Sequence, residues 1–185
     1  MCKGLVGYIY QDKVSLSYNE YGSEPDELGE DVLDLIVRIN KENGWEIFKT
    51  NSLKIKDKND SITDLFGSEW LNELYSGNLE YWSFDNEFIK ESLYCEYVYI
   101  INLDTMNFEF YIGFQQKPQI GNRFGTIEKD GYYPCKLSLI INIKDIVDTI
   151  DLKNLVDKMI KIDETSQDDN SVINLFRKPK LDAIN

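Results

Sequence analysis

Apolar and polar residues alternate near the start of the chain in a way that predicts a β-hairpin. Residues 14–18 are apolar at every second position, and residues 4–10 form a short apolar run rich in β-branched and aromatic side chains. The polar residues 11–13 join the two stretches, and this length is typical of hairpin connections. The chain therefore opens with two predicted antiparallel strands.

Apolar residues recur at helical spacing in three later segments. Residues 26–43 carry one apolar stripe, with Pro25 at the start and Gly44 after the end, where these residue types favour the two ends of a helix. Ser61 is a favourable N-cap for a second helix that ends at residues 76–78, and residues 152–162 show the same periodicity. We predict a helix in each segment.

Further strands are predicted in the second half of the chain. Residues 94–103 are almost wholly aromatic or β-branched, and residues 104–107 form a turn into a second such stretch, 108–114. These two strands are expected to form the central hairpin of the sheet. Residues 115–131 carry polar, Gly and Pro turn signals and predict an exposed loop, after which residues 132–143 return as a strand.

Together these elements predict a single α+β domain over residues 1–162. Its expected architecture is a mainly antiparallel sheet of about five strands with helices packed on it. A chain of 185 residues with 42% apolar residues can bury a substantial core. Residues 45–58 fit neither pattern clearly and stay unassigned, and residues 163–185 predict a polar C-terminal tail without stable structure.

Composition restricts the chemistry that the chain can perform. It contains no histidine, which excludes Ser-His-Asp and Cys-His catalytic arrangements. Its three cysteines are widely separated, which supports neither a disulfide framework nor a zinc site. No apolar stretch approaches the roughly 20 residues that span a bilayer, and the start lacks a signal-peptide pattern. We therefore expect a cytoplasmic protein with free thiols and without a metal or another cofactor.

Negative charge is the strongest compositional signal. The net charge is −13, and between Lys13 and Arg38 the chain has seven acidic residues and no basic one. Phosphate backbones and anionic membranes repel such a chain, so neither duplex DNA nor a membrane is an expected partner. A basic protein partner is expected instead. The alternative is an acidic surface that only keeps the domain in solution.

The acidic residues of this stretch are the candidate partner-binding site: Glu20, Glu24, Asp26, Glu27, Glu30, Asp31 and Asp34. The last four follow an i, i+3, i+4, i+7 spacing, which places them on one face of the predicted helix, opposite its apolar stripe. Mutual repulsion destabilises such a row of carboxylates, and a docking cationic surface relieves the repulsion.

Three segments of the chain resemble an uncharacterised family of small bacterial and phage proteins. The opening Met1-Cys2-Lys3-Gly4 corresponds to the family's Met-(Gly or Cys)-x-Arg-Gly. Residues 18–29 correspond to its Tyr-Asn-His-x-Asp-Ser-Tyr-Pro-x-x-Leu-Gly motif. Residues 95–105 and 111–114 correspond to a strand that leads into a Tyr-x-Gly-Phe turn, so the resemblance covers residues 1–145.

Some members of this family are similar to anti-CRISPR proteins. The resemblance therefore implies an inhibitor of a bacterial nucleic-acid-guided defence effector, such as a Cas effector or its guide-RNA complex. The nucleic-acid channel of such an effector is lined by Lys and Arg, and an acidic row can occupy it as a phosphate mimic. The family's His, Asp and Tyr are replaced here by Glu20, Gly22 and Glu24, which puts in doubt any activity that depends on them.

Two enzymatic alternatives remain open. Removal of Met1 would place the thiol and the α-amine of Cys2 at the start of a strand, as in an N-terminal-nucleophile hydrolase. The continuation Lys3-Gly4 differs from the Cys-Gly-Ile start that is typical of glutamine amidotransferases of this kind. The second alternative is a factor that cleaves guide RNA with carboxylates and a divalent ion, although no spaced set of acidic residues identifies its site.

Overall fold

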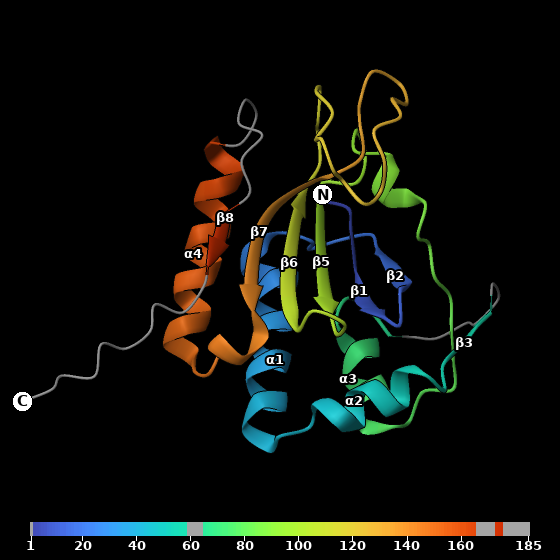
Figure 1. Cartoon of the computed structure of the whole chain (residues 1–185), viewed down its shortest axis with the longest axis vertical. Coiled ribbons are helices and arrows are strands. Elements are labelled where there is room, and N and C mark those ends of the chain that lie inside the picture. Colours follow the sequence, from blue (N-terminus) through green and yellow to red (C-terminus); the bar gives the residue numbers. More distant parts are fainter. Residues whose placement is uncertain (1, 59–64, 166–172, 176–185) are drawn as a thin grey trace, which may run out of the picture.

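The computed structural model describes residues 2–58, 65–165 and 173–175 and shows a sheet with helices packed against one face (Figure 1). The strand order is β2-β1-β5-β6-β7-β8, and the pairs β1–β5 and β7–β8 are parallel while the others are antiparallel. The strands are β1 (Gly4–Tyr10), β2 (Lys13–Asn19), β5 (Tyr97–Asn102), β6 (Asn107–Ile112), β7 (Lys136–Asn142) and β8 (Ile173–Leu175). The predicted α+β class with a mainly antiparallel sheet is confirmed.

The predicted N-terminal hairpin is confirmed as β1 and β2. Its turn residues Gln11 and Asp12 have φ angles of 51° and 60°, the left-handed conformation that a two-residue type I′ turn requires. Their backbone N–H groups donate to the carboxylate of Asp104 at 2.8 and 2.9 Å. Because Asp104 lies in the β5–β6 turn, it ties the two hairpin turns together at one end of the sheet.

The predicted central hairpin is confirmed as β5 and β6, which lie in the middle of the sheet. The parallel pairing of β5 with β1 was not predicted. The strand predicted over residues 132–143 is shorter than expected, because β7 begins only at Lys136. The preceding loop, residues 113–135, contains no helix and no strand beyond isolated bridges, as predicted.

The first predicted helix is wrong at its start. Pro25–Gly29 forms a π-helical turn, and the α-helix α1 runs from Glu30–Glu42. In the π-turn the N–H of Gly29 donates to the carbonyl of Glu24, five residues earlier, at 3.3 Å. A Cβ on Gly29 would come within 2.9 Å of the Tyr99 ring on β5. The close approach of this turn to the sheet therefore requires glycine.

The other helices depart from prediction mainly at their boundaries. α2 (Trp45–Ser52) occupies the segment that the sequence left unassigned. α3 (Glu69–Ser76) begins later than predicted, and the expected N-cap Ser61 lies outside the described residues. Gly77 ends α3 in the left-handed conformation, with φ of 77°. α4 (Thr149–Thr165) extends the third predicted helix at both ends.

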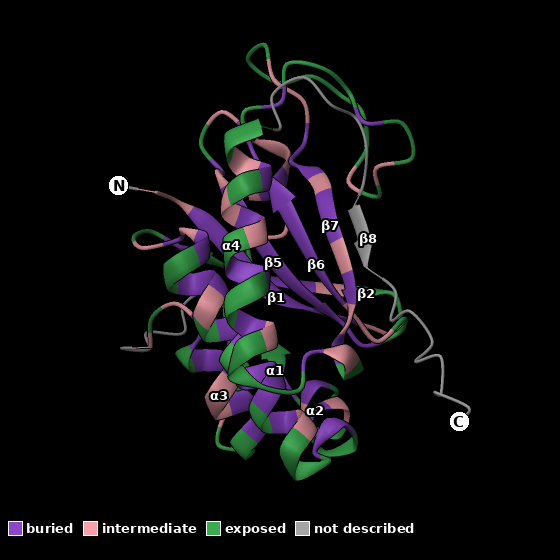
Figure 2. Ribbon diagram, turned by 90° about the vertical axis from the view of Figure 1, so that its left-hand side faces the viewer, coloured by how far each residue is buried: buried purple, intermediate pink, exposed green. Residues whose placement is uncertain are grey.

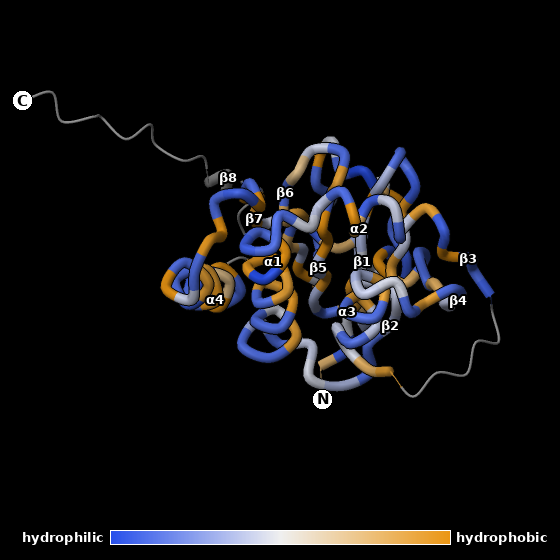
Figure 3. The backbone as a smooth tube through the Cα atoms, turned by 90° about the horizontal axis from the view of Figure 1, so that it is seen from below, coloured by the Kyte–Doolittle hydropathy of each residue, from blue (hydrophilic) through white to orange (hydrophobic). Residues whose placement is uncertain are grey.

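The helices α1 and α4 cover one face of the sheet, which we call the helical face (Figure 2). Val32 and Ile36 of α1 and Met159 of α4 are fully buried there and belong to one continuous apolar cluster with the strands. Burial of each such side chain contributes about 1.5–3 kcal/mol. Figure 3, seen from below, shows α4 beside α1, and α1 between α4 and the central strands.

The opposite face of the sheet, which we call the loop face, is covered by the loop 113–135 and by the chain around residues 86–95. A smaller apolar cluster lies here and includes Ile89, Cys95, Val98 and Cys135. Cys95 and Cys135 are free, as predicted, and the Cys135 thiol donates to the carbonyl of Cys95 at 3.3 Å. Two cysteines separated by 40 positions therefore meet under the loop.

The C-terminal region is described only in part. Residues 163–165, which were assigned to the tail, belong to α4, and the strand β8 pairs with β7. The remaining tail residues lie outside the described part of the chain. A small second sheet pairs β3 (Lys56–Asp57) with β4 (Tyr81–Trp82). Among the residues described, no helix is long and apolar enough to cross a membrane.

Candidate functional site: an acidic surface and a polar cavity

The seven predicted partner-binding residues lie along the loop after β2, the π-turn and the first two turns of α1. We call this region the acidic surface. Five of its side chains are exposed, and Glu24 and Glu30 are half-buried. The exposed five are Glu20, Asp26, Glu27, Asp31 and Asp34. The helix α1 buries its apolar stripe against the sheet, so its acidic positions point outward.

The structure places one of the four acidic residues that were predicted to share a helix face elsewhere. Glu30, Asp31 and Asp34 lie on α1 and share a face, as predicted. Glu27 lies in the π-turn instead, and its carboxylate lies over Gly22, at the position that a Cβ would occupy. The prediction of four carboxylates on one α-helical face is therefore wrong for Glu27, because a π-turn does not keep the 3.6-residue period.

The carboxylates of the acidic surface have no cationic partner among the described residues. None of the seven forms an ion pair there. Arg38 follows Asp34 by one turn, but its guanidinium lies over the ring of Tyr75, 5.4 Å from the ring centre. Asp31 accepts a hydrogen bond from the Ser68 hydroxyl at 3.2 Å. Most of these carboxylates therefore face solvent without an ion pair to any described residue.

The acidic surface is hollowed between α1 and α3. A depression of about 480 Å³ is lined by Asp31, Asp34 and Arg38 of α1 and by Glu69 and Asn72 of α3. Glu69 adds a third carboxylate that sequence reasoning did not include, because nothing in the local pattern places α3 beside α1. A Lys or Arg side chain of a partner could reach several carboxylates at once in this hollow.

The candidate nucleophile Cys2 lies half-buried two residues before β1, beside the carboxylates of Glu24 and Glu96. Burial, and then the neighbouring Glu24 and Glu96, raise the pKa of the Cys2 thiol to about 12. A nucleophilic cysteine needs the opposite, a lowered pKa that supplies thiolate at neutral pH. One oxygen of Glu24 is buried, and no described residue donates a hydrogen bond to it. These surroundings favour the protonated thiol and give no support to nucleophilic catalysis.

Metal-dependent cleavage has no identifiable centre in the described part of the chain. No group of three or more Cys, Asp or Glu side chains there has the geometry to hold a metal ion.

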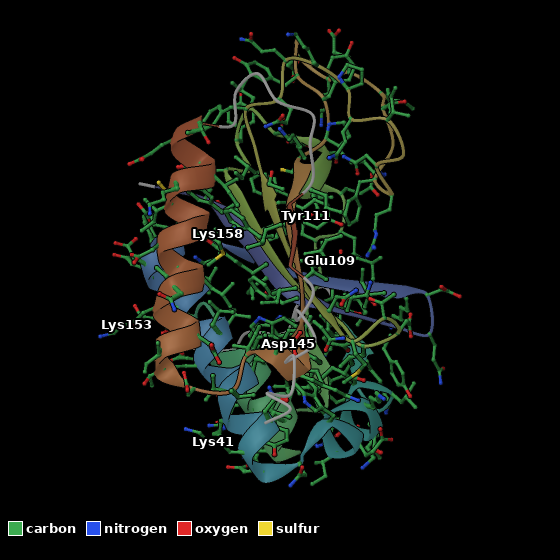
Figure 4. All side chains as sticks on the ribbon, turned by 60° about the vertical axis from the view of Figure 1, so that its left-hand side comes forward. Lys41, Glu109, Tyr111, Asp145, Lys153 and Lys158 are labelled. Carbon is green, nitrogen blue, oxygen red and sulfur yellow. The ribbon has the colours of Figure 1, made fainter. Side chains whose placement is uncertain are left out.

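A second polar centre, which sequence reasoning missed, lies on the loop face. Glu109 of β6 is only 2% exposed, yet its carboxylate accepts three hydrogen bonds. Asn102 and Arg123 donate to Oε1 at 2.8 and 2.9 Å, and the Tyr111 hydroxyl donates to Oε2 at 2.8 Å. Figure 4 shows Glu109 and Tyr111 on the side of the sheet away from α4 and its Lys153 and Lys158.

The surroundings of the Tyr111 hydroxyl favour its protonated form. Burial first, and then the charge of Glu109, hold the pKa of Tyr111 well above its usual range, while Arg123 acts in the opposite direction. The hydroxyl is therefore the donor in its hydrogen bond to Glu109. A sequence signal for this centre does exist, because the charged Glu109 interrupts the apolar run Phe108 to Ile112 on a strand that is buried on both faces.

Next to this centre the loop face contains a cavity of about 700 Å³, which we call the Arg123 cavity. Its lining includes Ile9, Asp12, Lys90, Asn102, Arg123 and Phe124. The volume lies in the range of small-ligand sites, and the lining combines apolar side chains with both signs of charge.

Comparison with known proteins identifies no relative. No family model matches the chain, and no curated protein or solved structure has significant similarity to it.

Proposed function

We propose that the protein is an inhibitor that binds a basic nucleic-acid-handling protein through its acidic surface. One observation supports the proposal above all others: seven clustered carboxylates have no cationic partner among the described residues. Their mutual repulsion costs stability in the free protein and is relieved when Lys and Arg side chains approach. Relief of this repulsion therefore contributes favourably to the free energy of binding.

The kind of partner follows from this charge pattern. A groove that binds nucleic acid is lined by Lys and Arg at phosphate spacing, and an acidic helix can occupy it in place of the phosphates. The depression between α1 and α3 offers carboxylates from two helices to one inserted cationic side chain. The resemblance of residues 18–29 and 95–105 to phage and bacterial proteins makes a nucleic-acid-guided defence effector of anti-CRISPR type the first partner to test.

The test is a charge reversal with a matched control. The triple variant Glu30→Lys, Asp31→Lys, Asp34→Lys reverses the α1 part of the acidic surface. The control Glu128→Lys, Asp157→Lys, Glu164→Lys changes the net charge by the same amount at exposed acids elsewhere. Binding to purified guide-RNA-loaded Cas effectors is measured for both. The first variant should bind at least about 100-fold more weakly than the control, since like charges across an interface cost several kcal/mol.

Competition identifies the surface of the effector that is occupied. Short duplex DNA carrying the effector's target should displace the protein, and the affinity should fall steeply with salt concentration. Equal binding by both triple variants would contradict the proposal. A complex that forms unchanged in the presence of saturating target DNA would place the protein outside the nucleic-acid groove.

A further inference from the structure

The Arg123 cavity presents a guanidinium that the protein itself holds in place. Arg123 comes from the loop 113–135, and its Nη2 donates to Oε1 of Glu109 at 2.9 Å. Glu109 is fixed in turn by Asn102 and Tyr111, and its side chain is 3% exposed. A long side chain normally loses rotamer freedom when it binds a ligand, and here much of that loss has already occurred on folding.

The held guanidinium keeps hydrogen-bonding capacity for a ligand. Arginine carries five N–H donors in a planar fork, and only the bond to Glu109 engages Arg123 within the described part of the chain. The side chain is 36% exposed and lines the cavity. Such a fork is suited to bidentate recognition of a planar carboxylate.

The charges around the cavity favour a ligand that also carries a positive group. Glu87 is paired with Lys90 at 2.8 Å, and both oxygens of Asp104 accept hydrogen bonds from the β1–β2 turn. Asp12 differs, because its carboxylate forms no ion pair or hydrogen bond with any residue that the structure describes. The groups of the cavity that keep hydrogen-bonding capacity are thus the remaining N–H donors of Arg123, whose charge is already shared with Glu109, and the carboxylate of Asp12.

A strongly anionic ligand fits this arrangement less well. A phosphate dianion at Arg123 would lie in a cavity whose lining holds three carboxylates, those of Asp12, Glu87 and Asp104. A monoanionic carboxylate accompanied by an ammonium group adds no net charge to this lining, and each of its ends can meet a group of opposite sign. Ile9 and Phe124 supply an apolar surface for the body of such a ligand.

We propose that the Arg123 cavity binds a small zwitterion of the amino-acid or short-peptide class. The ligand's carboxylate lies on the Arg123 fork, and its ammonium group lies at Asp12. A volume of about 700 Å³ leaves room for a peptide of a few residues. This site is separate from the acidic surface, because it lies on the loop face and none of the seven acidic-surface residues lines it.

The test uses the full chain and isothermal titration calorimetry at low salt. The probes are leucine, trialanine, the N-acetyl and C-terminal amide forms of each, and inorganic phosphate. Leucine or trialanine with free ends should bind, and blocking either end should weaken binding about tenfold or more, because a charge-assisted hydrogen bond is lost. Binding of phosphate alone, or of none of the probes at millimolar concentration, would overturn the proposal.

Two variants assign the ends of the ligand. Asp12→Asn leaves the Glu109–Arg123 bond intact and should remove the preference for the free amine over the acetyl form. Arg123→Lys keeps the charge but loses the fork, and should weaken binding of the free carboxylate about tenfold. The controls are Asp157→Asn and Lys153→Gln, at exposed positions on α4. Both control variants should bind the probes with the affinity of the parent protein. Affinities within twofold of the parent for both cavity variants would exclude the site.

Discussion

The same strands form both faces of the sheet, yet the two faces are covered in different ways. On the helical face, α1 and α4 bury a continuous apolar cluster in which polar side chains are rare. On the loop face, a loop without regular structure is attached to the strands by individual polar side chains, with only a small apolar cluster beneath it. A helix presents one apolar stripe that packs as a unit, whereas a loop must be fixed at separate points.

The attachments of the loop imitate the bonding of a strand. The side chain of Gln119 donates to the carbonyl of Leu137 at 2.8 Å and accepts from its N–H at 2.9 Å. Asn122 donates to the carbonyl of Cys135 at 2.9 Å. Together with the Glu109–Arg123 pair, these bonds cover the sheet with few buried apolar contacts. Regions of this kind open at a lower free-energy cost than apolar cores do.

The largest effect on stability is expected when a large buried side chain on the helical face is truncated, because the truncation leaves a cavity. Trp70 is 1% exposed, and its ring stacks on Trp82 with 5.4 Å between ring centres. Trp70→Ala should lower the free energy of unfolding by about 3–5 kcal/mol, measured by urea denaturation. The control Tyr81→Ala, at a position that is 40% exposed, should cost under about 1 kcal/mol. Similar losses for the two variants would mean that this region is not a packed core.

A smaller loss is expected when one loop attachment on the opposite face is removed. Arg123→Ala leaves the buried Glu109 without its cationic partner, although Asn102 and Tyr111 still donate to it. Since Arg123 is partly exposed, solvent reduces the effect, and urea denaturation should show a loss of about 1–2 kcal/mol. Arg123→Lys should recover part of the loss, and a loss as large as that of Trp70→Ala would make the two faces energetically equal.

Thiol labelling measures the opening of the loop face directly. Cys95 and Cys135 are fully buried under the loop and react with a thiol reagent only when it opens. Arg123→Ala should therefore increase the labelling rate of Cys135 about tenfold, as read by mass spectrometry of the labelled peptide. A variant on the helical face with a similar loss of stability, such as Ile36→Val, should accelerate labelling less. Equal acceleration would indicate that the protein opens only by global unfolding.

The difference between the faces also explains what the sequence could predict. The two hairpins and the helical segments follow from apolar residues that repeat every two or every three to four positions, and the fold class follows from them. The β1–β5 pairing, the position of α3 and the meeting of Cys95 with Cys135 depend on contacts between distant residues that no local period records. The π-turn before Glu30 was missed because helical spacing alone does not reveal an inserted residue.

The two candidate sites also differ in how far the sequence could predict them. The acidic surface could be predicted, because its residues are close in sequence and their outward orientation follows from the apolar stripe of α1. The Glu109–Arg123 centre could not be predicted, because its residues come from β6, from the last position of β5 and from a loop without sequence periodicity. Only Glu109 itself gave a signal, as a charge inside an apolar strand.

A moderate local effect is expected at Gln119. Gln119→Ala removes both hydrogen bonds to the backbone of Leu137, while the Glu109–Arg123 pair remains. Loss of this attachment should reduce stability by about 1 kcal/mol and increase hydrogen exchange of the Leu137 amide by about fivefold. The amide of Ile101, whose side chain faces the helices, should exchange as in the parent. Equal increases at both amides would contradict a local attachment.

The smallest expected effect is a change in the reactivity of the Cys2 thiol. Cys2 packs at the edge of the helical face. Burial first, and then the neighbouring Glu24 and Glu96, raise the pKa of this thiol from 9.0 to about 12, so the folded protein holds the proton more tightly than the unfolded chain does. The resulting stabilisation is fully present below pH 9 and is lost as the pH rises toward 12. Glu24→Gln should lower the pKa and increase the rate of iodoacetamide labelling of Cys2 at pH 9. The control is Glu20→Gln, a substitution at an exposed position in the same loop, which should leave the labelling rate unchanged. An equal response to both substitutions would show that the overall charge, and not the contact with Glu24, sets the reactivity of the thiol.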